Sequence, residues 1–354
     1  MNGFWKNKKV LITGDTGFKG SWLICLLMKL ESKVYGISLK LNKTNKLYKK
    51  LISEDQFVDS QKNNYQHFDL DIRDKQNLRK LIKEIKPEIV FHLAAQPLVR
   101  ESYKLPILTW EVNVMGTINL LNALRDLNYC SVVVITTDKV YENLSWSYSY
   151  RESDLLGGYD PYSSSKAAVE LAVKTWRKSF YKNQIRISTA RAGNVIGGGD
   201  WALERIVPDT IESLINQKPL LLRYPDAIRP WQHVLDPLFG YMLLAEKQIT
   251  SQKSFEYNFG PVESENITVA DLVKKIIDEW GSRLEINKLE NQPVETNYLK
   301  LATDKARNEL NWQPKWSFNQ SISKTVNWYK NVHLGKSVFE SIIDDIDSYL
   351  LNDH

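Results

Sequence analysis

The chain contains 354 residues, of which 43% are hydrophobic and 25% are charged, and its formal net charge is +5. This composition is ordinary for a soluble globular protein, and the length favours two domains or one large domain with an appendage. No apolar run approaches the ~20 residues that a membrane-spanning helix needs. The lysines between residues 40 and 50 are scattered, so we interpret that run as a solvated loop and predict no nucleic-acid partner.

Cysteine and histidine usage gives no sign of disulfides or of a metal site. Cys25 and Cys130 both lie in apolar runs, and they provide neither a disulfide framework nor a metal-ligand spacing. The basic residues near the N-terminus are followed at once by a strand and a turn, which does not fit a signal peptide. We predict a cytoplasmic protein that binds no metal and no membrane.

Short apolar runs alternate with helical patterns over the first 195 residues. Strands are predicted at Lys9–Thr13, Lys33–Ser38, Gln66–Asp69, Glu88–His92, Ser131–Thr136 and Ile185–Arg191. Helices are predicted at Ser21–Leu30, Lys75–Ile85 and Trp110–Leu124, and another begins near Tyr162. This alternation indicates a parallel sheet with helices on both faces. We therefore predict an α/β fold with a Rossmann-like doubly wound parallel sheet in residues 1–195.

The pattern loosens in residues 196–354, where prolines separate short segments and helices are predicted at Val269–Trp280 and Ser321–Val332. We expect this part to form mainly a smaller C-terminal substrate-binding lobe, with some segments returning to the first domain. Ligands of such sheets bind beyond the carboxyl ends of the strands. Gln96, Thr137 and Asn194 all follow predicted strands, so we expect them to share one site.

Glycines at Gly14, Gly17 and Gly20 stand between the first predicted strand and the first predicted helix. Glycine permits a tight turn and a close approach of the backbone to phosphate, and a helix N-terminus favours an anion. The pattern predicts a dinucleotide pyrophosphate site, and a plain strand-to-helix turn is the alternative. Ser38 ends the second strand, where an acidic residue would select NAD, so these residues leave NAD and NADP open.

Tyr162 and Lys166 are four residues apart and so share one face of a helix. A lysine ammonium next to a phenol favours the phenolate and lowers the phenol pKa from about 10. Tyr162 could then act as a base toward a sugar hydroxyl. Such a pair is common by chance, but here it follows both the glycine loop and Thr137, which comes directly after a central strand.

Several stretches along nearly the whole chain carry a family resemblance. They are TGDTGFKGSWL from Thr13, HLAAQPLVR from His92, NVMGT from Asn113, GGYDPYS from Gly157, RAGNVIGGGDWA from Arg191 and RPWQHVLDPL from Arg229. The chain is similar to the extended short-chain dehydrogenase/reductases of the NAD-dependent epimerase/dehydratase family, and more narrowly to the CDP-glucose 4,6-dehydratases. Asp15 and Thr137 depart from the pattern of that family, in which histidine and serine are common at these positions.

The resemblance implies a tightly held NAD that is reduced and reoxidised within one turnover. The cofactor contacts that we expect on this basis are Gly14, Thr16, Gly17, Phe18, Gly20, Asp71, Ile72, Ala94, Ala95, Tyr162 and Lys166. The resemblance also implies that Tyr162, supported by Lys166, takes the proton of the sugar 4-hydroxyl. CDP-glucose would become CDP-4-keto-6-deoxyglucose through C4 oxidation, loss of water across C5 and C6, and return of hydride to C6.

The elimination of water is expected to involve the residues after the central strand. The resemblance implies that Asp138 protonates the leaving C6 hydroxyl. In the related dTDP-glucose enzymes a glutamate follows and removes the C5 proton, whereas this chain has Lys139. A lysine is a base only when burial or a neighbouring cation such as Lys166 lowers its pKa from about 10.4. We predict that Lys139 assists C5 deprotonation or stabilises the enolate, and the alternative is a charge partner for Asp138.

Polar residues elsewhere in the chain are candidates for binding the sugar nucleotide. They are Gln96, Asn194, Arg205, Arg229 and His233, and for each the alternative is a purely structural hydrogen bond. In similar enzymes the helices that correspond to Trp110–Leu124 and Tyr162–Phe180 pair into a four-helix interface, so the resemblance implies a homodimer. It also implies a product for deoxysugar biosynthesis, including that of lipopolysaccharide O-antigen.

Three alternatives remain beside the CDP-glucose 4,6-dehydratase. An NAD-dependent epimerase shares the Tyr162–Lys166 pair, but it needs no acid for a C6 leaving group, so Asp138 and Lys139 favour the dehydratase. A 4,6-dehydratase for another nucleotide hexose is also compatible with the sequence, because no residue identifies cytosine by a physical argument. A redox sensor that binds a dinucleotide would have no reason to retain Thr137 together with that pair.

Overall fold

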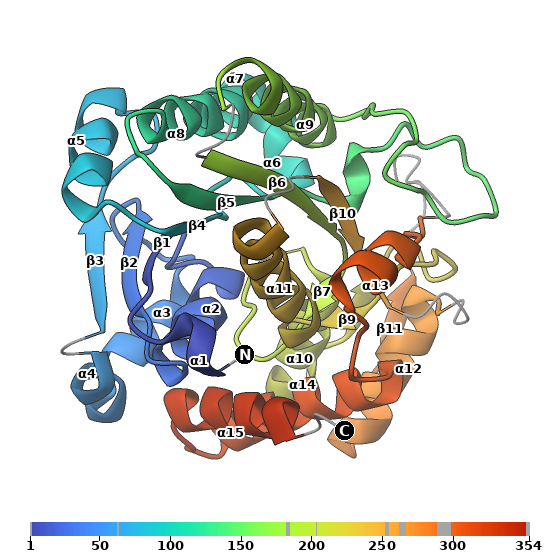
Figure 1. Cartoon of the computed structure of the whole chain (residues 1–354). Helices are drawn as coiled ribbons and strands as arrows, with labels where there is room; N and C mark the ends of the chain where they lie inside the picture. The colour runs from blue at the N-terminus through green and yellow to red at the C-terminus, as the bar shows by residue number, and fades with distance from the viewer. Residues whose placement is uncertain are drawn as a thin grey trace.

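The computed structural model describes residues 2–61, 64–181, 185–202, 204–251, 255–261, 267–288 and 299–351. Its centre is a seven-stranded parallel sheet with the strand order β10-β6-β5-β4-β1-β2-β3 (Figure 1). These strands are β1 (Lys9–Thr13), β2 (Lys33–Ser38), β3 (Tyr65–Asp69), β4 (Ile89–His92), β5 (Cys130–Ile135), β6 (Ile185–Ala192) and β10 (Glu256–Phe259). Every residue of β4 and β5 is buried, as expected for central strands covered on both faces. The predicted Rossmann-like doubly wound sheet is confirmed.

Helices cover both faces of the sheet (Figure 1). One layer contains α5 (Lys75–Ile85), α8 (Gly116–Leu124) and α9 (Pro161–Ser179). The other layer contains α2 (Phe18–Lys29) and α11 (Leu235–Ser251), and α11 packs on β5 and β6. None of the helices in the described part of the chain is both long and apolar enough to cross a membrane.

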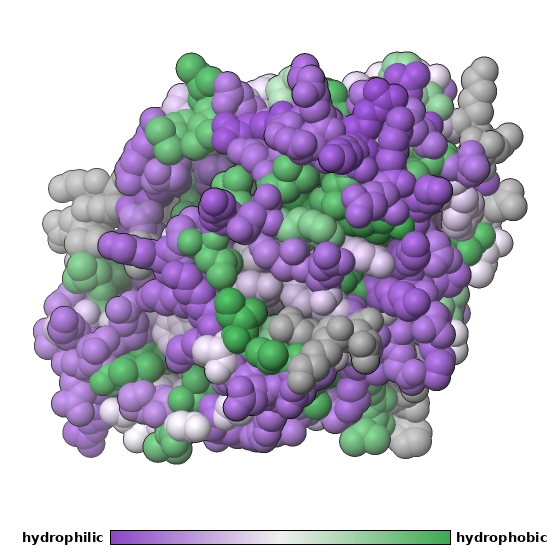
Figure 2. Space-filling model, turned by 90° about the vertical axis from the view of Figure 1, so that its left-hand side faces the viewer, coloured by the Kyte–Doolittle hydropathy of each residue, from purple (hydrophilic) through white to green (hydrophobic). Residues whose placement is uncertain are grey.

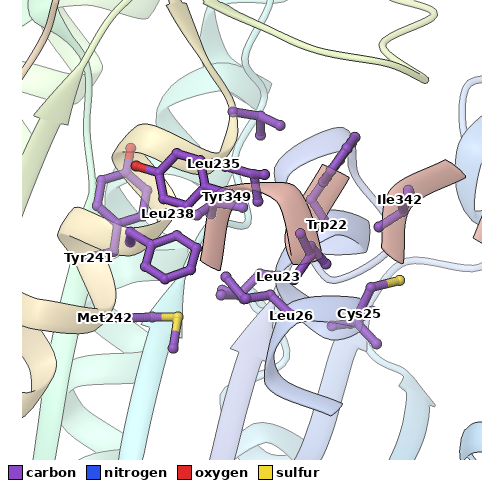
Figure 3. Close-up of a cluster of buried hydrophobic side chains, with 14 of the residues drawn as sticks. Trp22, Leu23, Cys25, Leu26, Leu235, Leu238, Tyr241, Met242, Ile342 and Tyr349 are labelled. Atoms are coloured by element: carbon purple, nitrogen blue, oxygen red, sulfur yellow. The ribbon is translucent and has the colours of Figure 1, made fainter. Parts of the chain in front are cut away.

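The last helix returns to the beginning of the chain. α15 (Val338–Leu351) packs against α2, and Figure 3 shows side chains of α2, α11 and α15 gathered in one apolar cluster. Trp22, Leu238 and Tyr349 represent the three helices in this cluster. β10 likewise comes from the second half of the chain and pairs with β6 at the edge of the main sheet. The second half of the chain therefore contributes a strand and helices to the sheet domain.

The smaller lobe lies next to the sheet domain and is built from short elements. They are β7 (Val195–Ile196), α10 (Ile206–Asn216), β8 (Leu220–Leu222), β9 (Gln232–His233), α12 (Val269–Trp280), β11 (Ile286–Lys288) and α14 (Phe318–His333). α13 (Asp304–Leu310) packs instead on α11 and β10 of the sheet domain. β8 pairs with β11, β7 pairs with β9, and α12 packs on α10 and α14. Hydrophilic side chains dominate the face of the molecule shown in Figure 2, with smaller apolar groups between them.

Two segments differ from the sequence-based expectation. The lysine-rich run is not a loop throughout, because Lys46–Ile52 forms α3, which packs against α2 and α15. Its Leu47, Tyr48 and Leu51 are buried, so apolar side chains at helical spacing stabilise the helix between the lysines. The predicted helix at residues 110–124 contains a π-helical segment, η1, between α7 and α8.

The remaining short elements are α1 (Asn2–Trp5), α4 (Asp55–Gln61), α6 (Val99–Lys104), α7 (Pro106–Trp110), η1 (Glu111–Met115) and η2 (Asp138–Val140).

A buried ion pair fixes α9 to the sheet. Arg191 of β6 donates from Nη2 to Glu170 Oε2 at 2.9 Å and from Nε to Oε1 at 3.0 Å. The hydroxyls of Thr136 and Thr189 donate to the same carboxylate. Both charged side chains are almost completely buried, so each needs the other to compensate for the loss of water.

Replacing Glu170 with glutamine should destabilise the fold strongly. The amide keeps the shape of the side chain but leaves the Arg191 charge buried and unpaired, which costs roughly 3–5 kcal/mol. Glu256→Gln is the matched control, because Glu256 and Arg177 form a 3.0 Å ion pair that stays partly exposed and should contribute about 1 kcal/mol or less. Urea unfolding followed by circular dichroism measures both variants, and equal losses would contradict this assignment.

Candidate active site

A cavity of 1480 Å³ lies where the loops that follow β1, β4, β5 and β6 meet. Pockets for one small ligand typically measure ~300–1,000 Å³, so this cavity has room for a dinucleotide together with a second ligand. It lies at the carboxyl ends of the parallel strands, where sheets of this kind bind ligands. Within the described ranges, no group of three His, Cys, Asp or Glu side chains is arranged to hold a metal ion.

The loop between β1 and α2 is shaped for phosphate. Gly14 has a φ of +76°, and a Cβ there would lie 2.7 Å from the backbone nitrogen of Ala94. A Cβ on Gly20 would lie 2.3 Å from the carbonyl oxygen of Gly14, so both positions require glycine. Gly17 is the N-cap of α2 and supplies no side-chain acceptor, which leaves the amides of the first helical turn available to an anion.

Neutral side chains form the end of the cavity next to β2. Thr16 Oγ1 lies 2.8 Å from Ser38 Oγ, and it accepts a hydrogen bond from Asn45 Nδ2 at 3.0 Å. These groups could bond ribose hydroxyls in place of the acidic residue that is common at NAD sites. Arg73 holds the Asp71 carboxylate at 2.7 Å, and this hydrogen bond lowers the pKa of Asp71. The other expected cofactor contacts that border the cavity are Phe18, Ile72, Ala94 and Ala95.

Thr137 and Asp138 follow β5 and enter the short helix η2. The Thr137 hydroxyl donates to Asp138 Oδ1 at 2.9 Å. Asp138 borders the cavity and is 1% exposed, and its Oδ2 has no hydrogen-bond partner among the described residues. A Cβ on Gly193 would lie 1.8 Å from this oxygen, so glycine is required there. A buried carboxylate oxygen without a partner is costly, and a ligand hydroxyl in the cavity would compensate for that cost.

Tyr162 and Lys166 lie in the first turns of α9, as their spacing predicts. Thr137 is near enough to the Tyr162 hydroxyl to influence its pKa, and Lys166 Nζ donates to the carbonyl of Ile135 at 3.0 Å. Burial raises the pKa of Tyr162 to about 12, and it lowers the pKa of Lys166 to about 8. The expected lowering of the tyrosine pKa by the lysine is therefore not found, because burial outweighs all charges near the phenol.

Two further lysines border the cavity. Lys139 follows Asp138 in the chain, but the Asp138 carboxylate is bonded to Thr137 and not to the Lys139 amine. The alternative role of Lys139 as a charge partner for Asp138 is therefore not supported by a contact. Lys19 was not assigned a role from the sequence, although it stands inside the glycine loop, and its Nζ lies 3.4 Å from the Tyr241 hydroxyl.

Three of the five expected substrate contacts border the cavity, namely Asn194, Arg205 and Arg229. Asn194 adopts a left-handed backbone with a φ of 47° directly after β6. Arg205 donates from Nη1 to Asp200 Oδ2 at 2.8 Å, and this pairing raises the pKa of Arg205. Two guanidinium groups at one cavity suit a diphosphate, since each offers several donors in a fixed plane. Asp200 also borders the cavity, and sequence analysis did not single it out.

The other two expected substrate contacts lie outside the cavity lining. The side-chain amide of Gln96 bonds Thr109 and the backbone of its own loop, so its polar atoms are engaged. His233 is 0% exposed, and its ring packs against Trp22 and Trp316 with centroid distances of 5.7 and 4.5 Å. Burial lowers the pKa of His233 to about 3, so its imidazole is neutral. The observed contacts of Gln96 and His233 therefore fit a structural role better than substrate binding.

Comparison with known sequences places the chain among nucleotide-sugar dehydratases. A family model described as GDP-mannose 4,6 dehydratase matches residues 11–325. A CDP-glucose 4,6-dehydratase from Salmonella typhimurium is 41% identical to the chain, and the match covers 98% of this chain and 97% of the relative. A dTDP-glucose 4,6-dehydratase from the same organism is 29% identical, and that match covers 91% and 92% of the two chains.

Solved structures share the fold. The dTDP-glucose 4,6-dehydratase from Bacillus anthracis in complex with NAD has a TM-score of 0.76 at 23% identity and covers 94% of this chain and 99% of its own. The UDP-glucuronic acid 4-epimerase from Bacillus cereus, in complex with UDP-glucuronic acid and NAD, has a TM-score of 0.80 at 24% identity, with 92% and 99% covered. Because the family model matches most of the chain and a dehydratase relative is 41% identical along nearly all of it, the chain belongs to the GDP-mannose 4,6 dehydratase family.

Proposed function

We propose that this protein is an NAD-dependent CDP-glucose 4,6-dehydratase, a hydro-lyase that forms CDP-4-keto-6-deoxyglucose. The observation that carries the proposal is the Asp138 carboxylate, which belongs to a residue lining the cavity and whose buried Oδ2 lacks a partner among the described residues. Thr137 donates to this carboxylate and influences the Tyr162 phenol, and Asp138 and Tyr162 line the same cavity, so an acid for C6 and a base for the 4-hydroxyl stand together. The 41% identity to the CDP-glucose 4,6-dehydratase from Salmonella typhimurium supports the choice of substrate.

The residues around the glycine loop fit NAD. The backbone at Gly14 and Gly17 would hold the pyrophosphate, and Thr16 with Ser38 would bond the adenosine ribose. When bound, NAD supplies the oxidant for C4 and later the hydride for C6. Tyr162 takes the proton of the C4 hydroxyl.

Water is lost after C4 has become a ketone, because the ketone acidifies the proton on C5. In its protonated form Asp138 donates a proton to the C6 hydroxyl as the C6–O bond breaks, the oxygen leaves as water, and Asp138 is left as a carboxylate. Arg205 and Arg229 bind the diphosphate of the sugar nucleotide and so hold the hexose in place. Asn194 borders the same cavity and can bond a sugar hydroxyl.

An epimerase is the second candidate function, because epimerases are among the solved structures with this fold. An epimerase would use Tyr162 and Lys166 in the same way but would need no proton donor for a leaving group at C6. Asp138 favours the dehydratase, since it brings a carboxyl group to the lining of the cavity.

Incubation of the purified protein with CDP-glucose tests the proposal directly. We expect a product with the alkaline absorbance of a 4-keto-6-deoxy sugar and a mass lower by one water. CDP-glucose epimerised without loss of water would contradict the dehydratase and support the second candidate. Turnover of a GDP, UDP or dTDP hexose in place of CDP-glucose would retain the reaction and correct the substrate.

Replacing Asp138 with asparagine should stop the elimination but not the oxidation. An amide cannot donate the proton that the leaving hydroxyl needs, so dehydration should fall by about 10²–10⁴-fold. Reduced cofactor should then accumulate when CDP-glucose is added, which absorbance of the reduced nicotinamide reports. Asp126→Asn serves as the control, because Asp126 pairs with Arg79 at the surface. Unchanged dehydration in the Asp138 variant would contradict the assignment.

We also propose that the protein is a cytoplasmic homodimer. Exposed apolar side chains lie on α7, η1 and α9, which pack against one another, and Ile107 with Leu171 are the most exposed of them. A surface of this kind favours association with a second copy. Cys25 and Cys130 are buried free thiols, in keeping with a reducing compartment. The product would serve deoxysugar biosynthesis, including that of lipopolysaccharide O-antigen.

Replacing Ile107 with glutamate should shift the protein from dimer to monomer. The side chain is 75% exposed, so the charge costs little in a monomer, but burial of that charge in a dimer interface is costly. Leu334→Glu is the control, since Leu334 is 83% exposed at the end of α14. Size-exclusion chromatography with light scattering measures both, and a monomeric parent protein would overturn the homodimer.

A further inference from the structure

We propose that His67 is a positively charged positioning residue of the NAD site, which compensates the Asp15 carboxylate in the glycine loop and so couples NAD binding to pH. The inference rests on the proposed NAD-dependent reaction, and it concerns a side chain that does not border the cavity. It starts from an acidic residue inside the loop that should receive a pyrophosphate. A carboxylate at such a loop repels an anion unless other groups neutralise it.

The Asp15 side chain reaches across the sheet. Asp15 follows β1, yet its Oδ2 lies 2.6 Å from the Tyr65 hydroxyl and 2.7 Å from Nδ1 of His67, and both of these residues belong to β3. β2 lies between β1 and β3, and a Cβ on Gly36 of β2 would lie 1.8 Å from the same oxygen. Glycine at this position therefore lets the glycine loop bond to side chains two strands away.

His67 contacts a carboxylate with each of its ring nitrogens. Nδ1 is bonded to Asp15, and Nε2 lies 3.2 Å from Oδ1 of Asp69 at the end of β3. An ionised carboxylate only accepts hydrogen bonds, and a histidine ring donates from both nitrogens only when it is protonated. The contacts therefore describe an imidazolium held between two carboxylates.

The surroundings of His67 favour the protonated ring. Burial alone would oppose the charge, but the hydrogen bonds to Asp15 and Asp69 outweigh it and raise the pKa of His67. Tyr65 donates to the same carboxylate beside the ring, and the ring of Tyr48 from α3 lies at a centroid distance of 5.7 Å. The residue paired with His67 on β2 is a glycine. In the described part of the chain, the titratable groups that face the ring are therefore two carboxylates and two phenols.

Protonation of His67 should strengthen NAD binding. The imidazolium balances the charge of Asp15, which lies between Gly14 and Gly17, and the backbone of these glycines would hold the pyrophosphate. Loss of the proton leaves a net negative charge in the loop and weakens its attraction for an anion. Because the pKa of His67 is raised in the folded protein, the stronger binding is present below that pKa and is lost as the pH rises through it. By reciprocity, bound NAD holds the proton on His67 more tightly.

The test compares the wild type with His67→Gln and with the double variant His67→Gln/Asp15→Asn. Bound cofactor is removed from the full chain with charcoal, and calorimetric titrations then measure the dissociation constants of NAD and of CDP from acidic to alkaline pH. CDP is the probe for the second ligand, which the glycine loop would not hold. His333→Gln is the matched control, because this exposed histidine lies at the end of α14, away from the cavity lining. Thermal unfolding reports whether each variant folds.

In the wild type the NAD dissociation constant should rise by up to about 10-fold with pH, which corresponds to one pKa unit of linkage. His67→Gln should bind NAD about 10-fold more weakly at acidic pH, with a smaller change as the pH rises. Lys19 in the first turn of α2 also titrates at the cavity, so the comparison of the two proteins is decisive and neither slope alone. Asp15→Asn in the double variant should restore binding to within about 3-fold of the wild type at acidic pH, because no charge then needs balancing. CDP binding and the His333 variant should match the wild type.

An unchanged pH dependence of NAD binding in His67→Gln would overturn the proposal. Equally weak binding in the double variant would also overturn it, because a purely steric role of His67 does not depend on the charge of Asp15. The titrations require no turnover. A protein that shows the expected coupling but does not convert CDP-glucose would therefore refute the proposed function and support the role of His67.

Discussion

The ion pair between Glu170 and Arg191 determines the geometry of the site. It joins the middle of α9 to β6, and the Thr136 hydroxyl adds β5 to the same network. Two catalytic parts of the site belong to the elements joined here. Tyr162 lies on α9, and Thr137 and Asp138 lie in the loop after β5. Replacement of a buried ion pair by apolar side chains is often neutral or stabilising, so stability alone does not explain this one. Its directional hydrogen bonds instead fix where helix and strands lie relative to each other.

The second constraint is that neighbouring segments pack directly against the backbone at several positions, where only glycine leaves enough room. Gly14 allows the loop after β1 to touch the loop after β4, and Gly193 allows Asp138 to reach the cavity from β5. A side chain on Gly36 would collide with the buried Asp15 carboxylate, which accepts hydrogen bonds from Tyr65. Polar groups can therefore be packed under and around the site without pushing the strands apart.

The sequence predicted what depends on local pattern. The apolar run of β5, the glycine loop and the spacing of Tyr162 and Lys166 can each be recognised within a few residues. The parallel sheet was predicted from the alternation of strand and helix patterns. His233 could not be placed in this way, because its neighbours Trp22 and Trp316 come from distant parts of the chain. The helix α3 was missed for the opposite reason, since its many lysines obscured three buried apolar positions.

The lysines that border the cavity come from separate segments of the chain. Lys139 stands next to the acid in sequence, and Lys166 stands one turn from the tyrosine, so both were assigned from the chain alone. Lys166 donates to the Ile135 carbonyl, which orients its amine toward the strand. Lys19 comes from the opposite layer of helices and shares the cavity with Asp138 only in the folded protein. The group of amines at this cavity is therefore a product of packing between separate helices, and no single segment encodes it.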